Sequence, residues 1–292
     1  MCHVTNAAHL RWKLEVPDQQ EEALCEWLEG AGSAAFYREA DPPKACYVYF
    51  SPGVYPPGAE GLKAFPGVYL LEAEVFGDED WLAKSRQGFG AFEVGKLFHV
   101  RPLWDETPGP ADRIDLVVNP GLAFGTGGHE TTRLCMKLLE ALSLAGRLQG
   151  PILDIGAGTG ILSLAAFLLG ARGLTAFDID PDCGPAMDEL MALNAHLLKG
   201  ARPYECFIGT LDQPRVAGPY SGLLANILLE TIQELLPRVA EVAAPGGWLI
   251  ASGILAERTD EALVSLVSHG FKPEKVLQEG EWIAILAERV PA

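Results

Sequence analysis

The chain of 292 residues is long enough for one large α/β domain and a smaller one, and its 49% hydrophobic residues exclude a disordered protein. Its 39 acidic and 22 basic residues give a formal net charge of −17, which disfavours direct binding of nucleic acid. The charge suits a basic partner protein, although it would equally serve to keep a protein in solution.

The N-terminal quarter shows short strand patterns around one helix. "HLRWKLEV" alternates apolar and polar residues as a half-buried strand does, and Pro17 and Asp18 then open a helix that ends at glycine. "AAFYREA", "ACYVYFS" and "VYLLEAEVF" are interpreted as further strands, and the proline- and glycine-rich piece before the last one allows only a short or degenerate helix. This order predicts a small βαββ(α)β domain over residues 1–76.

Residues 77–101 are interpreted as a linker with one helix, "DEDWLAKSRQGF", and "RIDLVVNP" further on has the pattern of a buried strand. From Thr131 onward, helix and strand patterns alternate as far as "EWIAILAER". Strands separated by helices of this length predict a parallel, doubly wound sheet with an antiparallel partner near its end. Residues 102–292 are therefore expected to form an α/β domain.

A glycine-rich turn inside this domain indicates a nucleotide-like ligand. "LDIGAGTGILSLAA" places an apolar strand before GxGxG and a helix after it, so the backbone can approach a ligand and the helix start offers free N–H groups. Asp178 lies 178 − 156 = 22 residues after Gly156, at the end of the next strand, where a carboxylate can accept hydrogen bonds from ribose hydroxyls. The dinucleotide fingerprint is GxGxxG, which differs from this turn. A purely structural role for the glycines remains open.

Five motifs carry a family resemblance. "NPGLAFGTGGHETTRLC", "LDIGAGTGILSLAA", "FDIDP", "LLANIL" and "LIASGIL", in that order, resemble PrmA, the bacterial methyltransferases of large-subunit ribosomal protein eleven. The resemblance covers residues 80–289 by motif, and residues 1–76 fit the family's substrate-recognition domain by pattern only. It implies a class I methyltransferase Rossmann-like doubly wound sheet with a small N-terminal ferredoxin-like α+β domain. It also implies S-adenosyl-L-methionine as the cofactor and a ribosomal large-subunit protein as the substrate.

The resemblance further implies the residues of the site. The cofactor contacts would be Thr132, Gly156, Gly158, Asp178 and Asn226, with Phe124, Gly125, Thr126 and His129 in a loop that covers the cofactor. Asp154, just before the glycines, would hold the turn and the methionine amino group, or the turn alone. This chain departs from the family at Asn119, where aspartate is usual, and at Gly128 and Glu130, where Thr-His-Pro is common around the histidine.

Methyl transfer from a sulfonium is an in-line displacement, so the protein need only align the nucleophile and exclude water. The family's acceptors are the α-amino group and lysine ε-amino groups, which attack only when neutral. Asn226 is assigned the catalytic role of offering its side-chain oxygen to the amine, and its alternative is a cap on the strand-to-helix turn. His129 is either a proton acceptor or bonded to backbone, and Trp282 is most simply a core residue.

Other functions stay open at this point. A lysine methyltransferase of another protein and a small-molecule methyltransferase are alternatives, and a cofactor-binding regulator and a nicotinamide-dependent oxidoreductase are more distant ones. Six scattered cysteines without CxxC spacing indicate reduced thiols, and the absence of HxH and HExxH pairs suggests no metal site. The longest nearly apolar run, "ILSLAAFLLGA", is shorter than the ~18 residues of a membrane helix. We expect a cytoplasmic monomer that contacts neither membrane nor nucleic acid.

Overall fold

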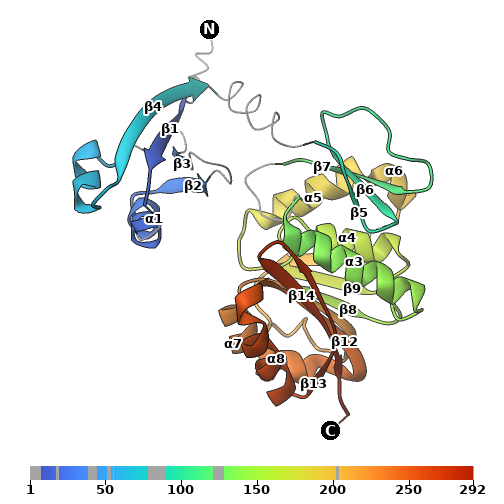
Figure 1. Cartoon of the computed structure of the whole chain (residues 1–292). Helices are drawn as coiled ribbons and strands as arrows, with labels where there is room; N and C mark the ends of the chain where they lie inside the picture. The colour runs from blue at the N-terminus through green and yellow to red at the C-terminus, as the bar shows by residue number, and fades with distance from the viewer. Residues whose placement is uncertain are drawn as a thin grey trace. The chain divides into compact units, whose positions relative to one another are not determined.

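The structure is a computed structural model that describes residues 8–17, 20–38, 45–50, 54, 56–77, 90–120, 128–201 and 204–291. The chain divides into two compact units, Met1–Gly88 and Phe89–Ala292 (Figure 1). Among the helices within these described ranges, none has the length and apolar character of a membrane-crossing segment.

The first unit is a four-stranded antiparallel sheet with one face covered. Its elements are β1 (Ala8–Glu15), α1 (Glu21–Gly30), β2 (Ser33–Arg38), β3 (Ala45–Phe50), the 3₁₀ helix η2 (Ala59–Ala64) and β4 (Tyr69–Gly77), with strand order β2-β3-β1-β4. The alternation in β1 turns Trp12 and Leu14 inward, where they share a core with Leu24 and Leu28 of α1 and Leu62 of η2. The predicted ferredoxin-like order and the short second helix are both confirmed.

The second unit contains a seven-stranded sheet. Its order is β10-β9-β8-β11-β12-β14-β13; the first five strands run parallel, and β14 is antiparallel to both of its neighbours. The strands are β8 (Ile152–Ile155), β9 (Leu174–Asp178), β10 (Tyr204–Ile208), β11 (Tyr220–Asn226), β12 (Ala243–Leu255), β13 (Phe271–Glu279) and β14 (Trp282–Arg289). The parallel sheet and its antiparallel partner are as predicted.

Helices cover both faces of this sheet, as a doubly wound fold requires. One buried cluster joins it to α3 (Glu130–Leu144), α4 (Ile161–Leu168), α5 (Cys183–Leu193) and α6 (Ala195–Leu198). The other cluster joins it to α7 (Leu229–Val242) and α8 (Thr259–Ser268), which follows the short 3₁₀ helix η3 (Ala256–Arg258). β8 is buried along its whole length because helices pack on both of its sides.

A smaller three-stranded sheet, β5-β6-β7, precedes α3 in the second unit. It consists of β5 (Phe92–Val94), β6 (Phe98–Pro102) and β7 (Ile114–Val118). β5 and most of β6 fall inside the stretch interpreted as a linker, where they pair with each other and β6 pairs with β7. The helix predicted over residues 78–89 lies outside the described residues.

Helices α5 and α6 are separated at Asn194, whose side chain is fully buried. Its amide Oδ1 accepts a hydrogen bond from the Val117 N–H at 2.9 Å, and its Nδ2 donates to the Val117 carbonyl at 2.7 Å and to the Leu190 carbonyl at 2.9 Å. The side chain thus bonds both backbone groups of one β7 residue as a neighbouring strand would. These hydrogen bonds hold Asn194 against β7, which explains the interruption between α5 and α6.

Candidate active site

The glycine-rich turn lies between β8 and α4. Gly156 and Gly160 adopt φ angles of +67° and +79°, which favour glycine. A β-carbon at Gly156 would lie 2.5 Å from Cγ2 of Ile227, and one at Gly160 would lie 2.4 Å from the hydroxyl oxygen of Tyr204. Conformation and packing therefore both require glycine at the first and third positions of the turn.

Asp178 ends β9 and holds the middle of this turn. Its Oδ2 accepts a hydrogen bond from the Gly158 N–H at 2.8 Å, and its Oδ1 accepts one from the Asp180 N–H at 3.0 Å. Each carboxylate oxygen keeps a further lone pair, so contacts to ligand hydroxyls stay possible. Ile179 follows, 74% exposed, and the partly exposed Ile208 pairs with Asp178 across the sheet. The carboxylate is thus flanked by apolar side chains that sequence reasoning did not select.

Asp154 lies beneath the turn, almost completely buried. Its Oδ2 accepts a hydrogen bond from the Ser163 hydroxyl at 2.7 Å. Burial raises the pKa of Asp154 to about 6, although hydrogen bonds from the Ser163 side chain and backbone oppose the rise. Asp154 therefore fixes the first turn of α4 against β8, and its contact with a methionine amino group stays a prediction. Ser163 was missed, and its only sequence signal is a lone hydroxyl in the apolar run "ILSLAA".

Asn226 ends β11 at the same edge of the sheet. Its Nδ2 lies 3.4 Å from Oγ1 of Thr132, the buried threonine in the first turn of α3. Its Oδ1 is buried and meets no hydrogen-bond donor among the residues that the structure describes. A buried acceptor without a donor destabilises a fold by about 1–3 kcal/mol. An incoming N–H group would remove this penalty, so the geometry suits an acceptor for an amine.

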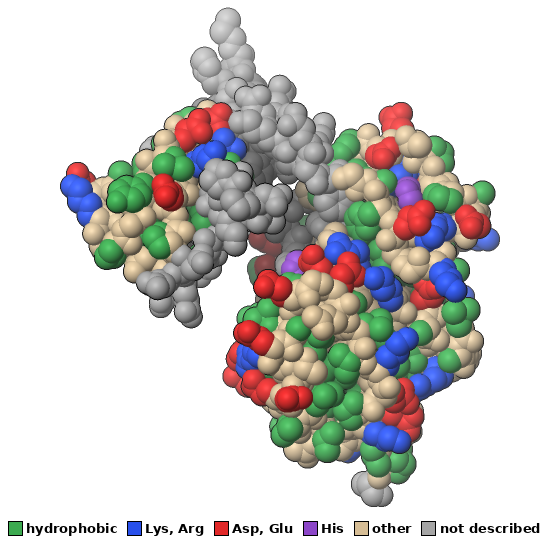
Figure 2. Space-filling model, viewed as in Figure 1, with side chains coloured by type: hydrophobic (Ala, Val, Ile, Leu, Met, Phe, Trp, Pro, Cys, Tyr) green, Lys and Arg blue, Asp and Glu red, His purple; other side chains and the backbone are tan. Residues whose placement is uncertain are grey.

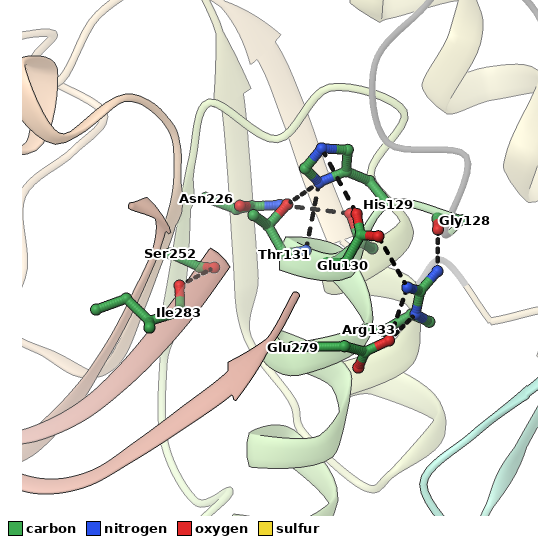
Figure 3. Close-up of polar contacts among 10 residues, drawn as sticks. Gly128, His129, Glu130, Thr131, Arg133, Asn226, Ser252, Glu279 and Ile283 are labelled. Atoms are coloured by element: carbon green, nitrogen blue, oxygen red, sulfur yellow. Dashed lines mark hydrogen bonds and ion pairs between the residues drawn. The ribbon is translucent and has the colours of Figure 1, made fainter. Parts of the chain in front are cut away.

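His129 caps the N-terminus of α3. Its Nδ1 accepts a hydrogen bond from the Thr131 N–H at 3.3 Å and lies 2.8 Å from Oγ1 of Thr131 (Figure 3). Burial lowers the pKa of His129; the charge of Glu130 raises it and that of Arg133 lowers it further. The ring therefore bonds to backbone as a neutral imidazole. It packs against the Trp282 ring in a T-shaped arrangement with the ring centroids 5.1 Å apart. Trp282 is partly buried and packs against the core cluster of the second unit.

The predicted site residues fall into two groups. One group lies at the carboxyl edge of the parallel strands and at the adjoining helix starts, and its members are Thr132, Asp154, Gly156, Gly158, Asp178 and Asn226. His129 belongs to this group as the N-cap of α3. Phe124, Gly125 and Thr126 lie outside the described residues.

Comparison with known proteins gives consistent matches. The family described as ribosomal protein L11 methyltransferase (PrmA) matches residues 64–290. The ribosomal protein L11 methyltransferase of Trichlorobacter lovleyi is 39% identical over 242 residues, which cover 79% of this chain and 75% of that protein. The one of Synechococcus elongatus is 37% identical over 225 residues, covering 76% and 73%. A crystal structure of ribosomal protein L11 methylase from Lactobacillus delbrueckii subsp. bulgaricus is similar with a TM-score of 0.59 and 28% identity, over 70% of this chain and all of that one.

Proposed function

The chain belongs to the PrmA family of ribosomal protein L11 methyltransferases, and we propose that it transfers methyl groups from S-adenosyl-L-methionine to amino groups of ribosomal protein L11. It is a protein methyltransferase with the α/β fold of that family. The acceptors in this proposal are the α-amino group and lysine ε-amino groups. The observation that carries the proposal is Oδ1 of Asn226, which is buried beside the glycine-rich turn and meets no donor within the described part of the chain.

The residues at the turn fit the proposed cofactor. Three glycines leave the backbone between β8 and α4 without side chains at Gly156, Gly158 and Gly160. The carboxylate of Asp178 keeps lone pairs for ribose hydroxyls. The exposed Ile179 and the partly exposed Ile208 offer apolar surface for a purine ring. When bound, the cofactor's sulfonium supplies the electrophilic methyl group.

The chain's own part in the reaction is to orient a neutral amine. Because Nδ2 of Asn226 donates to Thr132, the amide oxygen is the atom left to accept the amine N–H. An uncharged acceptor orients the nitrogen without favouring its protonated form, whereas a carboxylate would raise the amine's pKa. Asn226 is therefore the proposed catalytic residue, and Thr132 fixes the orientation of its amide.

The first unit is proposed to recognise the protein substrate, in keeping with the predicted domain over residues 1–76. Figure 2 shows Lys and Arg side chains interspersed with Asp and Glu side chains on the visible face of the described chain. With a formal net charge of −17, the chain as a whole favours a basic protein partner over nucleic acid. Action in the cytoplasm as a monomer belongs to the same proposal.

Mass spectrometry tests the proposal directly. Ribosomal protein L11 and a mixture of the other ribosomal proteins are incubated with the enzyme and S-adenosyl-L-methionine, and mass increments of whole methyl groups are expected on L11. Asn226→Ala should abolish them, whereas Glu274→Gln on the distant part of β13 should not. Methylation confined to another protein would refute the proposal that L11 is the substrate. Stabilisation by NAD and not by S-adenosyl-L-methionine in a thermal-shift assay would support the oxidoreductase alternative.

A further inference from the structure

A cluster of charged side chains joins the start of α3 to the end of β13. Oε1 of Glu279 lies 2.7 Å from both Nε and Nη2 of Arg133 (Figure 3). The other carboxylate oxygen, Oε2, lies 2.6 Å from Nζ of Lys137. The remaining Nη1 of Arg133 donates a hydrogen bond to the carbonyl oxygen of Gly128. Glu130 lies 3.5 Å from Nη2 of Arg133. One guanidinium thus binds the residue before the helix cap and a strand far along the chain at the same time.

The burial of these groups favours a rigid contact. The side chains of Arg133 and Glu279 are 21% and 29% exposed, so solvent screens their interaction less than it screens an open surface pair. Burial alone would raise the pKa of Glu279, but hydrogen bonds from Lys137 and Arg133 hold it below the usual range. The carboxylate is therefore charged at neutral pH and accepts from both cations.

The hairpin formed by β13 and β14 contacts the helix cap at a second point. Trp282, three residues after Glu279, packs its ring against that of His129 in a T-shaped arrangement, and Nδ1 of His129 accepts a hydrogen bond from the Thr131 N–H. The next residue, Thr132, accepts the hydrogen bond from the Asn226 amide. A continuous path of contacts therefore runs from the hairpin through the first turn of α3 to the proposed acceptor for the amine.

We propose that Arg133 and Glu279 form a clamp that positions the first turn of α3, and through Thr132 the amide of Asn226, for cofactor binding and methyl transfer. Arg133 is a positioning residue, since it acts through Gly128 and the helix cap. Arginine is required because its planar fork reaches Gly128 and Glu279 together, whereas the single ammonium of lysine cannot keep both contacts in this geometry. The inference rests on the proposed function for its catalytic part only.

A control for the clamp exists nearer the start of the same strand. Arg147, just after α3, pairs with Glu274 of β13 at 2.7 Å, and their side chains are 33% and 27% exposed. This pair has similar chemistry and involves the same strand, but it lies beyond the C-terminal end of α3, away from the helix cap. Glu274→Gln therefore removes an arginine–carboxylate ion pair of β13 without touching the clamp.

The test compares Arg133→Lys and Glu279→Gln with Glu274→Gln in the full chain, after circular dichroism has shown that each variant is folded. Hydrogen exchange of the free protein should accelerate about fivefold at the amides of Thr131 and Arg133 in both clamp variants, as expected for losing ~1 kcal/mol of local stability, and not in the control. Calorimetry should show S-adenosyl-L-methionine binding about fivefold weaker in the clamp variants, and kcat should fall while melting temperatures match the control.

The outcomes separate the two proposals. Equal exchange rates in the clamp and control variants would overturn the clamp, whatever the enzyme methylates. Faster exchange with unchanged cofactor affinity and kcat would overturn its role in positioning the site. Failure of the wild-type protein to bind S-adenosyl-L-methionine would refute the proposed function, while the exchange measurement would still decide whether the clamp orders the helix start.

Discussion

Replacing Asp154 by asparagine should change how the stability of the Phe89–Ala292 unit depends on pH. Burial raises the pKa of this carboxyl group to about 6 in the folded protein, against roughly 3.9 in an unfolded chain. Between these two values the folded state binds a proton that the unfolded state has lost. The group's contribution to stability is therefore fully present below the unfolded pKa and is lost as the pH rises through the folded pKa.

The size of the effect follows from the difference between the two pKa values. A shift of about 2 pKa units corresponds to about 3 kcal/mol of unfolding free energy lost between pH 3 and pH 8. About half of this, ~1.4 kcal/mol, falls between pH 5 and pH 8. Asparagine has nearly the same shape and no ionisation, so the Asp154→Asn variant should lack this loss.

Urea unfolding of both proteins at pH 5, 6, 7 and 8 measures the effect as a difference. Groups that titrate alike in both proteins cancel in this difference. As the pH rises from 5 to 8, the free energy of unfolding of the variant should therefore increase by about 1.4 kcal/mol relative to that of the wild type. Asp212→Asn, which removes an 84% exposed carboxylate, is the control and should leave the pH dependence nearly unchanged. Parallel stability curves for the wild type and Asp154→Asn would refute the buried, proton-binding carboxyl group.

Three further predictions address the proposed roles. Asp178→Asn should weaken S-adenosyl-L-methionine binding in calorimetry about tenfold or more, because it removes charged acceptors for ribose and for Gly158; a folded variant with unchanged affinity would remove Asp178 from the cofactor site. Asn226→Asp should be slow at neutral pH and recover toward about pH 10, since a carboxylate favours the protonated amine; stopped assays with a wild-type pH profile would leave Asn226 as a structural cap. Deleting residues 1–76 should leave cofactor binding measurable but abolish L11 methylation, and methylation at full rate would assign the first unit another role.

The parallel sheet could be predicted from the sequence because its strands are buried on both faces and appear as short apolar runs, as β8 does. β13 could not, because most of its side chains are exposed and Pro273 interrupts the pattern. Its pairing is decided by β14, which supplies a buried neighbour over nearly its whole length. Hydrophobic periodicity in a sequence reflects which side chains are buried, and few side chains of this edge strand are buried.

The candidate site shows the same division between local and distant information. The glycine turn and Asp178 follow from spacing, because a strand, a turn and a helix are consecutive in the chain. The contact between Arg133 and Glu279 joins residues 146 positions apart, and no local pattern brings them together. The amide oxygen of Asn226 is likewise set by packing, since only the fold shows that none of the described residues places a donor against it.

The buried amide of Asn194 affects how the exposed edge of β7 can pair with other molecules. β7 is an outer strand of its three-stranded sheet, and such a strand offers unpaired N–H and C=O groups on which a second molecule can add a strand and begin to aggregate. The Asn194 side chain occupies both groups of Val117, near the end of β7. A neighbouring molecule therefore finds no free backbone donor or acceptor at Val117, so addition of a strand is disfavoured at this position of the edge.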